Sequence, residues 1–416
     1  MTVHDQTGPS VPTATGTPGP GETEQWQLTA PHAPVRAAIA ERVFRHAARN
    51  LAVTVSFPDG TRLGRGGPLL RVVRPAPFFH RLGAQGNIGF GEAYMAGDWE
   101  SPDLAAALTP FAERMATLVP PPLQALRRLV DVRRPPVERN TPDGARSNIQ
   151  RHYDLSNELF EVFLDESMTY SSAWFGPGDD LCAAQLRKID GILDYAGVRD
   201  GSRVLEIGTG WGALAIRAAR RGATVTSLTI SVEQRELARL RVAAAGLSDR
   251  VSVELRDYRA ATGTYDAVVS VEMIEAVGEE FWPAYFRTLA RVLAPGGRVG
   301  LQAITMPHDR LLATRHANNW IQKYIFPGGL LPSVPVVESQ AARAGLSVVT
   351  RRSLGPHYAR TLASWRSRFL AAWDRVDALG FDPVFERMWE FYLAYSEAGF
   401  RSRYLDVWQF GLRSAG

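Results

Sequence analysis

One short segment constrains the fold more than any other: Glu206-Ile-Gly-Thr-Gly-Trp-Gly. It follows Arg203-Val-Leu-Glu-Ile, which has the length and composition of a buried strand, and it precedes an amphipathic stretch from Ala213 to Arg221. Glycine is needed where the backbone turns sharply or passes close to a ligand, and Gly212 is expected to let a helix approach the sheet. The segment therefore predicts a strand, a ligand-binding turn and a helix in direct succession.

The spacing of these glycines separates two classes of nucleotide-binding fold. Positions 208, 210 and 212 give G-x-G-x-G, whereas the dinucleotide fingerprint is G-x-G-x-x-G. A nicotinamide site also needs an acidic residue at the end of the second strand, where this chain has Leu228-Thr-Ile-Ser. Asp257 follows the third strand and suits the exocyclic amine of an adenine, and Pro295-Gly-Gly precedes a later strand. Together these features predict an S-adenosylmethionine-dependent methyltransferase.

Short apolar strands alternate with amphipathic helices from position 203 onward. The predicted strands are 203–207, 224–230, 251–255, 266–271 and 298–304, and the predicted helices are 213–221, 232–245 and 281–293. This alternation is typical of a doubly wound parallel sheet. The predicted fold class is therefore α/β, with a class I methyltransferase (Rossmann-like) sheet.

The first part of the chain has a different organisation. Residues 1–27 are rich in Pro, Gly, Thr and Ser and are expected to be a disordered tail. Residues 28–125 are expected to form a smaller α+β domain, with a helix at 33–50, strands at 51–60 and 69–73, and a helix from about 101. Residues 126–146 have the composition of a linker, and 147–416 are expected to form the methyltransferase domain.

The basic residues are unusual in kind rather than in number. The net charge is +4, and Lys188 and Lys323 are the only lysines among 47 basic residues. The excess of arginine over lysine has two explanations, which are compatible: a GC-rich genome, and a role for guanidinium groups in binding lipid phosphates. The arginines of the linker have two possible roles: they contact lipid phosphates, or they belong to a solvated connector. These residues are Arg127, Arg128, Arg133, Arg134 and Arg139. Aromatic nucleic-acid motifs do not accompany the charge, so nucleic acid is not expected as a partner.

Other features exclude several classes of protein. The single cysteine, Cys182, excludes an intramolecular disulfide and a thiolate metal cluster, and the eight histidines show no paired metal spacing, so no metal is expected. The first residues lack the basic and apolar regions of a signal peptide, and no stretch approaches the ~20 apolar residues of a membrane-spanning helix. We therefore expect a cytoplasmic protein with peripheral contact to the inner face of the cell membrane.

Five further motifs point to one family. They are Arg151-His-Tyr-Asp-Leu-Ser-Asn-Glu-Leu-Phe, Thr169-Tyr-Ser-Ser-Ala, Leu228-Thr-Ile-Ser-Val-Glu-Gln, Lys323-Tyr-Ile-Phe-Pro-Gly-Gly and Leu405-Asp-Val-Trp-Gln. From about Val53 to Phe410 the chain resembles the cyclopropane fatty acid synthase family. The resemblance implies transfer of a one-carbon unit from S-adenosylmethionine to the cis double bond of an unsaturated phospholipid acyl chain, through a carbocation. The stretch from Gly91 to Trp99 resembles the family's accessory, lipid-side domain.

The resemblance also implies a site. The cofactor would contact Tyr170, Ser171, Glu206, Gly208, Gly210, Thr229, Ile230, Gln234, Asp257 and Tyr258. The family holds a bicarbonate ion as the base with a cysteine, a glutamate, a histidine, a backbone amide and a tyrosine, and the matching positions are Ser172, Glu275, Gln302, Ile304 and Tyr358. Serine and glutamine still donate hydrogen bonds to an oxyanion, but neither is charged. These two departures leave open whether the product is a cyclopropane or a methylene-branched chain.

Two other functions stay open at this point: a small-molecule or natural-product C- or N-methyltransferase, and a non-catalytic lipid-binding relative. The motifs that run through both predicted domains argue against the first, and the retention of Gly208, Gly210, Glu275 and Tyr358 argues against the second. The oligomeric state is also open, a homodimer included, and a partner reductase is expected only if the product carries a methylene branch. Some residues are either ordinary core or lining of an acyl tunnel, namely Trp174, Phe175, Trp320, Tyr324 and Phe326.

Overall fold

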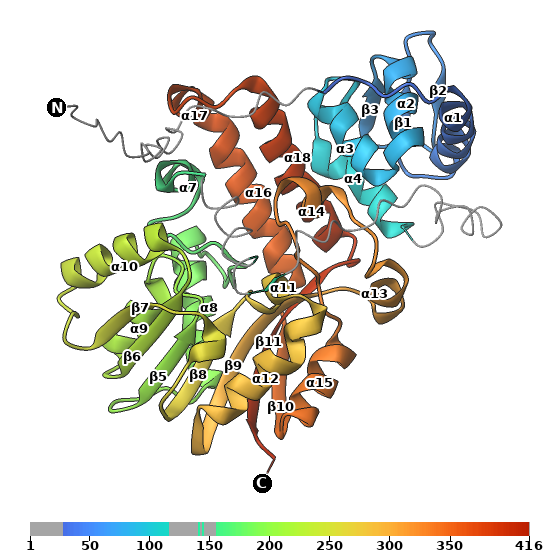
Figure 1. Cartoon of the computed structure of the whole chain (residues 1–416). Coiled ribbons are helices and arrows are strands. Elements are labelled where there is room, and N and C mark those ends of the chain that lie inside the picture. Colours follow the sequence, from blue (N-terminus) through green and yellow to red (C-terminus); the bar gives the residue numbers. More distant parts are fainter. Residues whose placement is uncertain (1–27, 116–139, 142–143, 145–154, 416) are drawn as a thin grey trace, which may run out of the picture.

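The computed structural model describes residues 28–115, 140–141, 144 and 155–415. The predicted tail and the linker arginines lie outside the described residues, and so does the first part of the Arg151-His-Tyr-Asp motif. Figure 1 shows two sheets, a small one at the upper right and a large one at the bottom, with long helices between them.

The larger sheet has seven strands in the order β10-β11-β9-β8-β5-β6-β7. Their bounds are β5 (Arg203–Ile207), β6 (Thr224–Thr229), β7 (Val251–Leu255), β8 (Tyr265–Val271), β9 (Leu293–Thr305), β10 (Leu346–Ser353) and β11 (Asp406–Ser414). The five predicted strands and the α/β class are confirmed. These five strands pair in parallel, as expected, whereas β10 and β11 were not predicted, and β11 pairs antiparallel with both β9 and β10.

The two faces of this sheet are covered by different helices. On one face lie α8 (Leu181–Tyr195), α9 (Ala213–Arg220) and α10 (Val232–Ala244); on the other lie α12 (Trp282–Arg291) and α15 (Val334–Arg343). Successive residues of β5 alternate between the two layers: Val204 packs with the first set and Leu205 with the second. Parallel strands covered on both faces are apolar nearly throughout, which explains their sequences.

The smaller sheet has the strand order β2-β1-β3-β4. Its strands are β1 (Thr54–Ser56), β2 (Arg62–Leu63), β3 (Leu69–Val72) and β4 (Trp99–Glu100), and β1 and β2 form the predicted hairpin. Helix α1 (Pro34–Arg49) confirms the first predicted helix, and α4 (Leu104–Glu113) confirms the one expected from about residue 101.

Two helices in this region were not predicted, α2 (Pro75–Gln85) and α3 (Asn87–Met95). Their sequences contain proline and several glycines, which normally indicate turns. The glycines serve close packing instead: a Cβ on Gly89 would lie 1.9 Å from the carbonyl oxygen of Arg81, and one on Gly91 would lie 2.4 Å from the ring of Trp320.

Helices from the end of the chain lie between the two sheets and share the core of the smaller one. These are α16 (Gly355–Ala371), α17 (Trp373–Ala378) and α18 (Pro383–Arg401), and their buried side chains belong to the same apolar cluster as those of α1 to α4. The remaining described elements are α7 (Asn157–Phe163), α11 (Ile274–Val277), α13 (His308–Thr314), α14 (Trp320–Tyr324) and the 3₁₀ turns η3 (Tyr258–Ala260) and η4 (Glu279–Phe281). Among the described residues, no helix combines the length and apolar character that crossing a membrane requires.

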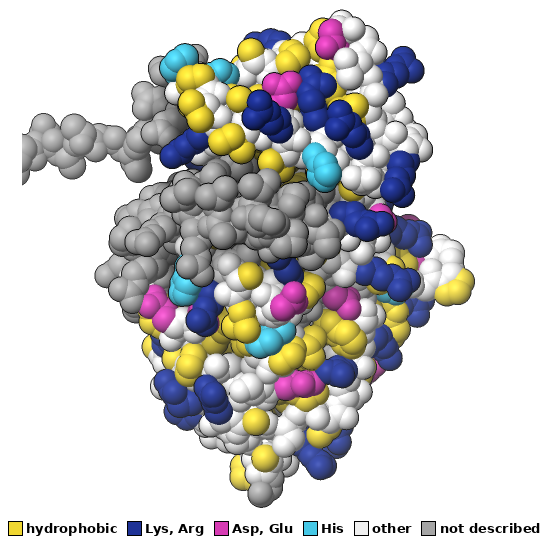
Figure 2. All heavy atoms as spheres, turned by 90° about the vertical axis from the view of Figure 1, so that its right-hand side faces the viewer, with side chains coloured by type: hydrophobic (Ala, Val, Ile, Leu, Met, Phe, Trp, Pro, Cys, Tyr) yellow, Lys and Arg dark blue, Asp and Glu magenta, His cyan; other side chains and the backbone are white. Residues whose placement is uncertain are grey.

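Basic side chains are spread over the surface. On the face in Figure 2 they lie among acidic and hydrophobic groups in both halves of the molecule, rather than in one patch. Many arginines are held in ion pairs with neighbouring acids, for example Arg203 with Asp266 and Arg351 with Glu338. The structure thus places part of the arginine excess in local surface pairs.

Candidate active site

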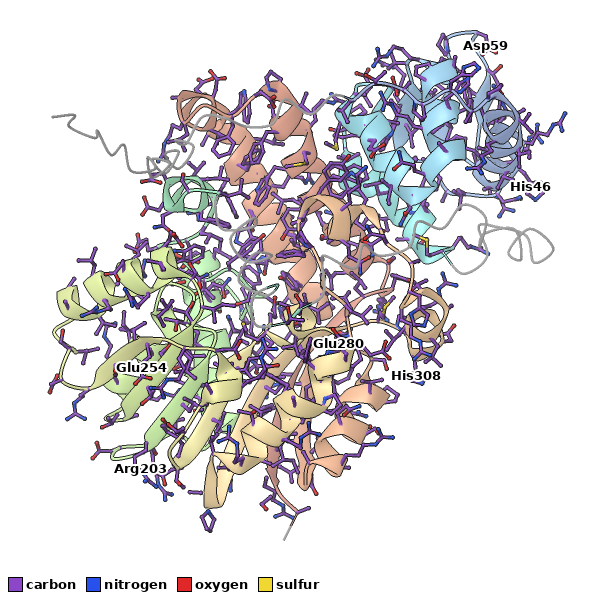
Figure 3. The ribbon with its side chains drawn as sticks, in the orientation of Figure 1. His46, Asp59, Arg203, Glu254, Glu280 and His308 are labelled. Carbon is purple, nitrogen blue, oxygen red and sulfur yellow. The ribbon has the colours of Figure 1, made fainter. Side chains whose placement is uncertain are left out.

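The carboxyl ends of the parallel strands define one edge of the large sheet. In Figure 3, Arg203 marks the opposite edge, where β5 begins, and Glu280 lies near the edge where β8 has ended. Ligands of open α/β sheets bind outside the carboxyl ends of the strands. The predicted site residues of β5, β6, β8 and β9 lie within the last few residues of these strands or just beyond their ends.

The glycine turn leaves the end of β5. Gly208 has φ +94° and Gly210 has φ +52°, backbone conformations that favour glycine. A Cβ on Gly208 would lie 2.6 Å from Cγ of Met273, whereas one on Gly210 would meet nothing within 4 Å. Gly212, the residue before α9, faces Ala238 of α10, so it allows two helices to approach rather than a helix and the sheet.

Glu206 is buried at the end of β5. Its Oε2 accepts a hydrogen bond from Ser227 Oγ (2.5 Å), which lies 2.6 Å from Thr209 Oγ1. Burial raises the pKa of Glu206 to about 8, although the nearby ammonium group of Lys188 opposes this. A carboxyl group held at this position can accept a hydrogen bond from a charged amino group of a ligand.

The predicted contacts at the ends of β6 and β7 form two local networks. Thr229 Oγ1 donates to Gln234 Oε1 (3.0 Å), and Ser231 caps α10, while Ile230 lies between them. Asp257 and Tyr258 follow β7, and the carboxylate of Asp257 forms a two-pronged pair with Arg259, at 2.9 and 2.8 Å. The predicted adenine contact of Asp257 therefore shares its carboxylate with a guanidinium group.

Tyr170 and Ser171 lie before α8, beside a buried lysine. The hydroxyl groups of Tyr170 and Tyr392 are 2.7 Å apart, and Lys188 Nζ donates to Ser171 Oγ at 2.5 Å. Lys188 is 1% exposed, and burial lowers its pKa to about 8. The sequence interpretation did not assign Lys188 to the site, although it is one of two lysines in an arginine-rich chain.

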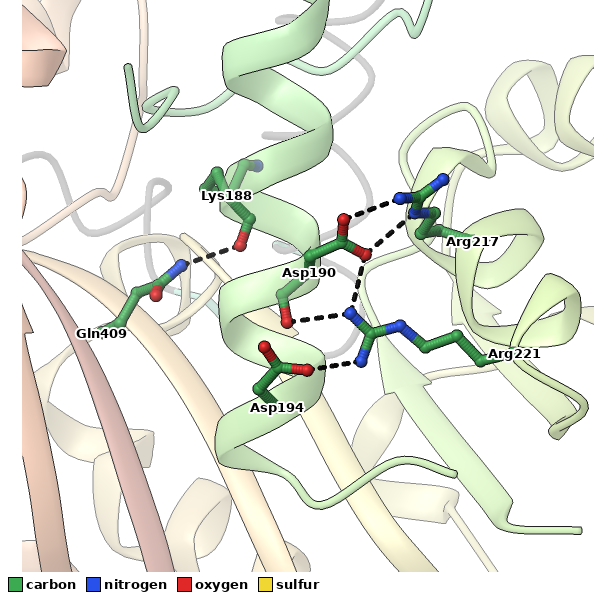
Figure 4. Close-up of polar contacts among 6 residues, drawn as sticks. All are labelled: Lys188, Asp190, Asp194, Arg217, Arg221 and Gln409. Carbon is green, nitrogen blue, oxygen red and sulfur yellow. Dashed lines mark hydrogen bonds and ion pairs between the residues drawn. The ribbon is translucent and has the colours of Figure 1, made fainter. Parts of the chain in front are cut away.

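Helix α8 is fixed on both sides of this lysine. Figure 4 shows Arg217 of α9 and Arg221, the residue that follows this helix, bound to Asp190 and Asp194 of α8. On the other side, Gln409 of β11 donates to the carbonyl oxygen of Lys188 (3.0 Å). These contacts hold the backbone from which the ammonium group extends.

A second carboxylate, Glu272, accepts hydrogen bonds from three residues of the predicted anion site. Its Oε1 accepts from the backbone N–H of Ser172 (2.9 Å) and from Gln302 Nε2 (2.8 Å), and its Oε2 accepts from the hydroxyl group of Tyr358 (2.7 Å). The amide of Gln302 is oriented by Gln409, whose Nε2 donates to Gln302 Oε1 (3.0 Å). The structure thus brings together the expected donors, but around a side chain of the protein.

The hydroxyl group of Ser172 does not take part in this arrangement. It donates to the carbonyl oxygen of the next residue, Ala173, at 3.0 Å. Only the backbone N–H of Ser172 points to Glu272. The expectation that the serine hydroxyl replaces a cysteine thiol as an anion donor therefore does not hold in this geometry.

Glu275 lies one turn beyond Glu272. Its Oε1 accepts from the backbone N–H of Ile304 (2.5 Å), as the resemblance implied for that amide, and its Oε2 is enclosed but accepts no hydrogen bond from the described residues. Desolvation, followed by the charge of Glu272, raises the pKa of Glu275 to about 8. Leu330 N–H donates to the carbonyl oxygen of Glu275 (2.8 Å), so the segment after Lys323 supports this turn.

Sequence reasoning overlooked Glu272 because the resemblance assigned only the second glutamate of Val271-Glu-Met-Ile-Glu. One signal was present: two glutamates in an otherwise apolar stretch directly after a strand. Glu272 also has φ +52°, a conformation uncommon for residues other than glycine, which the sequence does not reveal.

The aromatic residues named from the sequence fall into different environments. Trp320 is buried against Phe391 and Tyr324, and the hydroxyl group of Tyr324 and the ammonium group of Lys323 both donate to Glu92 of α3. Trp174 and Phe175 lie under the guanidinium groups of Arg352 and Arg360, and Phe326 packs on Tyr392. Phe326 thus contacts a residue that is hydrogen-bonded to Tyr170 of the predicted site.

The sheet, the glycine turn and the strand-end residues define the class: this protein is an S-adenosylmethionine-dependent methyltransferase of the class I fold. Residues 140–410 match the family described as mycolic acid cyclopropane synthetase, and the chain belongs to this family. The identification confirms the family that the sequence motifs resemble.

The individual relatives extend over different parts of the chain. Tuberculostearic acid methyltransferase UfaA1 of Mycobacterium tuberculosis is 52% identical over 412 residues, which cover 95% of this chain and 96% of the relative. Cyclopropane-fatty-acyl-phospholipid synthase of Escherichia coli is 35% identical over 344 residues, 82% of this chain and 86% of the relative. A crystal structure of mycolic acid cyclopropane synthase CmaA1 with SAH and CTAB is 34% identical with a TM-score of 0.60, over 64% of this chain and 97% of that one.

Proposed function

We propose that the enzyme transfers a methyl group from S-adenosylmethionine to the double bond of an unsaturated phospholipid acyl chain and releases a methylene-branched chain. One observation carries the proposal. A glycine turn of the kind that binds S-adenosylmethionine, two carboxyl groups and a set of aromatic rings lie together at one edge of the sheet. The 52% identity to a tuberculostearic acid methyltransferase, against 35% to a cyclopropane synthase, favours the branched product over the ring.

The residues at the strand ends fit S-adenosylmethionine. The turn has open space at Gly210, and Glu206 presents a buried carboxyl group close to it. Thr229 and Gln234 add polar groups at the end of the neighbouring strand. When bound there, the cofactor supplies a methyl group on a sulfonium, which an alkene can attack without a protein nucleophile.

The protein's part is to orient the alkene, exclude water and stabilise positive charge. The aromatic rings beside Glu272 suit the last task, because ring faces attract cations. The ring of Tyr358 lies 4.5 Å from that of Phe400 and 6.2 Å from that of Trp365, and Trp365 lies 5.3 Å from Tyr170. A cation on the acyl chain would meet ring faces together with one carboxylate.

Bicarbonate, which the resemblance implies as the base, does not fit this arrangement. The amide of Gln302 and the hydroxyl group of Tyr358 donate to Glu272. The hydroxyl group of Ser172 donates to Ala173 and the N–H of Ile304 donates to Glu275, so the donors expected to hold the ion are engaged within the protein.

The remaining parts of the proposal concern substrate and partners. Residues 28–125 would form a lipid-side domain that contacts the membrane surface. The ion pair between Glu92 and Lys323 would couple this domain to the segment that supports Glu275 of α11. Arginines exposed on this region would bind lipid phosphates, which makes the attachment peripheral. A methylene-branched product would pass to a separate reductase if a saturated branch is formed.

The test is incubation of the full chain with methyl-labelled S-adenosylmethionine and vesicles of unsaturated phospholipid, followed by mass spectrometry of the fatty acids. A gain of one CH₂ unit in the acyl chain, with the label, supports the proposal. Vesicles of fully saturated phospholipid are the matched control. Label in a small-molecule acceptor but not in lipid would indicate the alternative methyltransferase, and binding of vesicles without any transfer would indicate a lipid-binding relative.

A further inference from the structure

We propose that Glu272 is the resident base of this enzyme: its carboxylate takes the proton from the alkylated acyl chain, in the place where relatives use an external oxyanion. The inference rests on the proposed function. It differs from that function in one respect, because it concerns which group removes the proton and not which substrate is methylated.

The first support is the set of hydrogen bonds. Two of the three groups that point to Glu272, the amide of Gln302 and the hydroxyl group of Tyr358, are those expected to hold a small oxyanion, and the third is the backbone N–H of Ser172. They are supplied by three separate segments: strand β9, helix α16 and the turn before α8. A carboxylate offers about four lone-pair positions, of which Oε1 uses two and Oε2 uses one. One acceptor position on Oε2 is therefore left for a proton, beside the hydroxyl group of Tyr358.

The second support is electrostatic. Desolvation raises the pKa of Glu272, which makes the carboxylate a stronger base, while the buried ammonium group of Lys188 and the three donors favour its ionised form. Glu275 accepts backbone N–H groups, that of Ile304 among them, but no side-chain donor among the described residues, and its raised pKa is caused by desolvation and then by the charge of Glu272. Of these two neighbouring carboxyl groups, Glu275 therefore holds the proton and Glu272 carries the charge.

The third support is the backbone. Glu272 adopts φ +52° directly after β8, where a glycine would fit without strain. A strained conformation at a non-glycine residue persists when its surroundings require it, and such positions concentrate at functional sites.

The step is balanced as follows. The alkene's electron pair forms a bond to the transferred methyl carbon, while the bond from that carbon to the sulfonium sulfur breaks and its electron pair stays on sulfur. This leaves a cation on the chain. When a hydrogen shifts along the chain with its electron pair, the cation moves to the carbon that bears the methyl group. A methyl C–H bond then breaks, its electron pair becomes the C=C bond of the methylene branch, and the proton passes to Oε2 of Glu272. The neutral Glu272 releases this proton to solvent before the next turnover.

Two substitutions separate this proposal from its alternatives. Glu272→Gly removes the carboxylate, relieves the backbone and leaves room for about the four heavy atoms of bicarbonate among the same three donors. Glu272→Gln removes the charge but keeps the volume. Loss of a general base typically lowers the rate by about 10²–10⁴-fold. We expect both variants to fall by at least about 100-fold, and only Glu272→Gly to recover activity in millimolar bicarbonate or formate.

The wild-type enzyme provides the test that needs no variant. In degassed, bicarbonate-free buffer its rate of label transfer to unsaturated phospholipid is expected to stay within about twofold of the rate with added bicarbonate. Cofactor affinity, measured by calorimetry, is expected to be the same for wild type and both variants, which shows that the site is folded. Strict dependence of the wild type on bicarbonate, or full activity of Glu272→Gln, would overturn the inference and leave the proposed function standing. If wild type transfers no label to lipid in either buffer, the proposed function itself fails.

Discussion

Replacing Gly208 by alanine probes the contact between the glycine turn and the carboxylate site. The new Cβ would lie 2.6 Å from Cγ and 2.7 Å from Sδ of Met273, where carbon atoms normally stay about 3.5–4.0 Å apart. An L-residue at the positive φ of Gly208 costs about 1–2 kcal/mol, and overpacking costs about 1–3 kcal/mol. The free energy of unfolding should therefore fall by about 2–5 kcal/mol. Because Met273 follows Glu272, its displacement should also lower turnover.

The assay compares Gly208→Ala with Gly246→Ala by urea unfolding, by calorimetry with S-adenosylmethionine and by turnover. Gly246 also has a positive φ, at +69°, but a Cβ there meets nothing within 4 Å, and it follows α10 away from the site. The control should lose only the conformational part, about 1–2 kcal/mol, and should bind the cofactor normally. Equal stability, affinity and turnover for the two variants would refute the assignment of the turn.

Three further predictions concern charged groups, two of them in the site and one at the surface. Lys188→Met removes the ammonium group that lowers the pKa of Glu272. Turnover should therefore fall at least about 10-fold, and the acid limb of its pH profile should move to higher pH. The control variant Lys323→Met, at the other lysine, should keep the wild-type pH profile. The pKa of Glu275 is about 8 in the folded state and about 4.3 in the unfolded state, so folding binds a proton at pH values between these two. The free energy of unfolding should therefore decline as the pH rises from about 5 to 8. Glu275→Gln should show a shallower decline in urea titrations, and an equally steep decline would contradict the shift in pKa. Attachment to anionic vesicles should weaken with salt, since each basic residue near the surface contributes ~1 kcal/mol, and equal binding at 0.05 and 0.5 M salt (roughly a threefold change in Debye length) would exclude the electrostatic part.

The central strands could be predicted from the sequence because their physical signal is local. Parallel strands covered on both faces are continuous apolar runs, and the turn after β5 needs glycines that stand in the sequence as G-x-G-x-G. The reversed strand β11 could not be predicted in this way. Its direction depends on α16 and α18, which carry the chain between β10 and β11.

The candidate site was predictable in part for the same reason. Glu206, Thr229 and Asp257 stand at strand ends, so their positions follow from the strands. Glu272 and Lys188 were missed because their roles depend on contacts among α8, β8, β9 and α16, which no local pattern reveals. In the N-terminal region, α3 was not predicted, because its glycines are typical of turns, whereas in the structure they allow the helix to pack against Arg81 and Trp320.

The most direct test of the account is the mass of the acyl product formed from labelled S-adenosylmethionine and monounsaturated phospholipid vesicles, with the position of the added carbon determined by fragmentation. The account predicts an acyl chain heavier by one CH₂ unit that carries the label in a methylene branch, formed at the same rate with and without bicarbonate. Label confined to a headgroup, or to a small molecule with no change in the acyl chain, would contradict it.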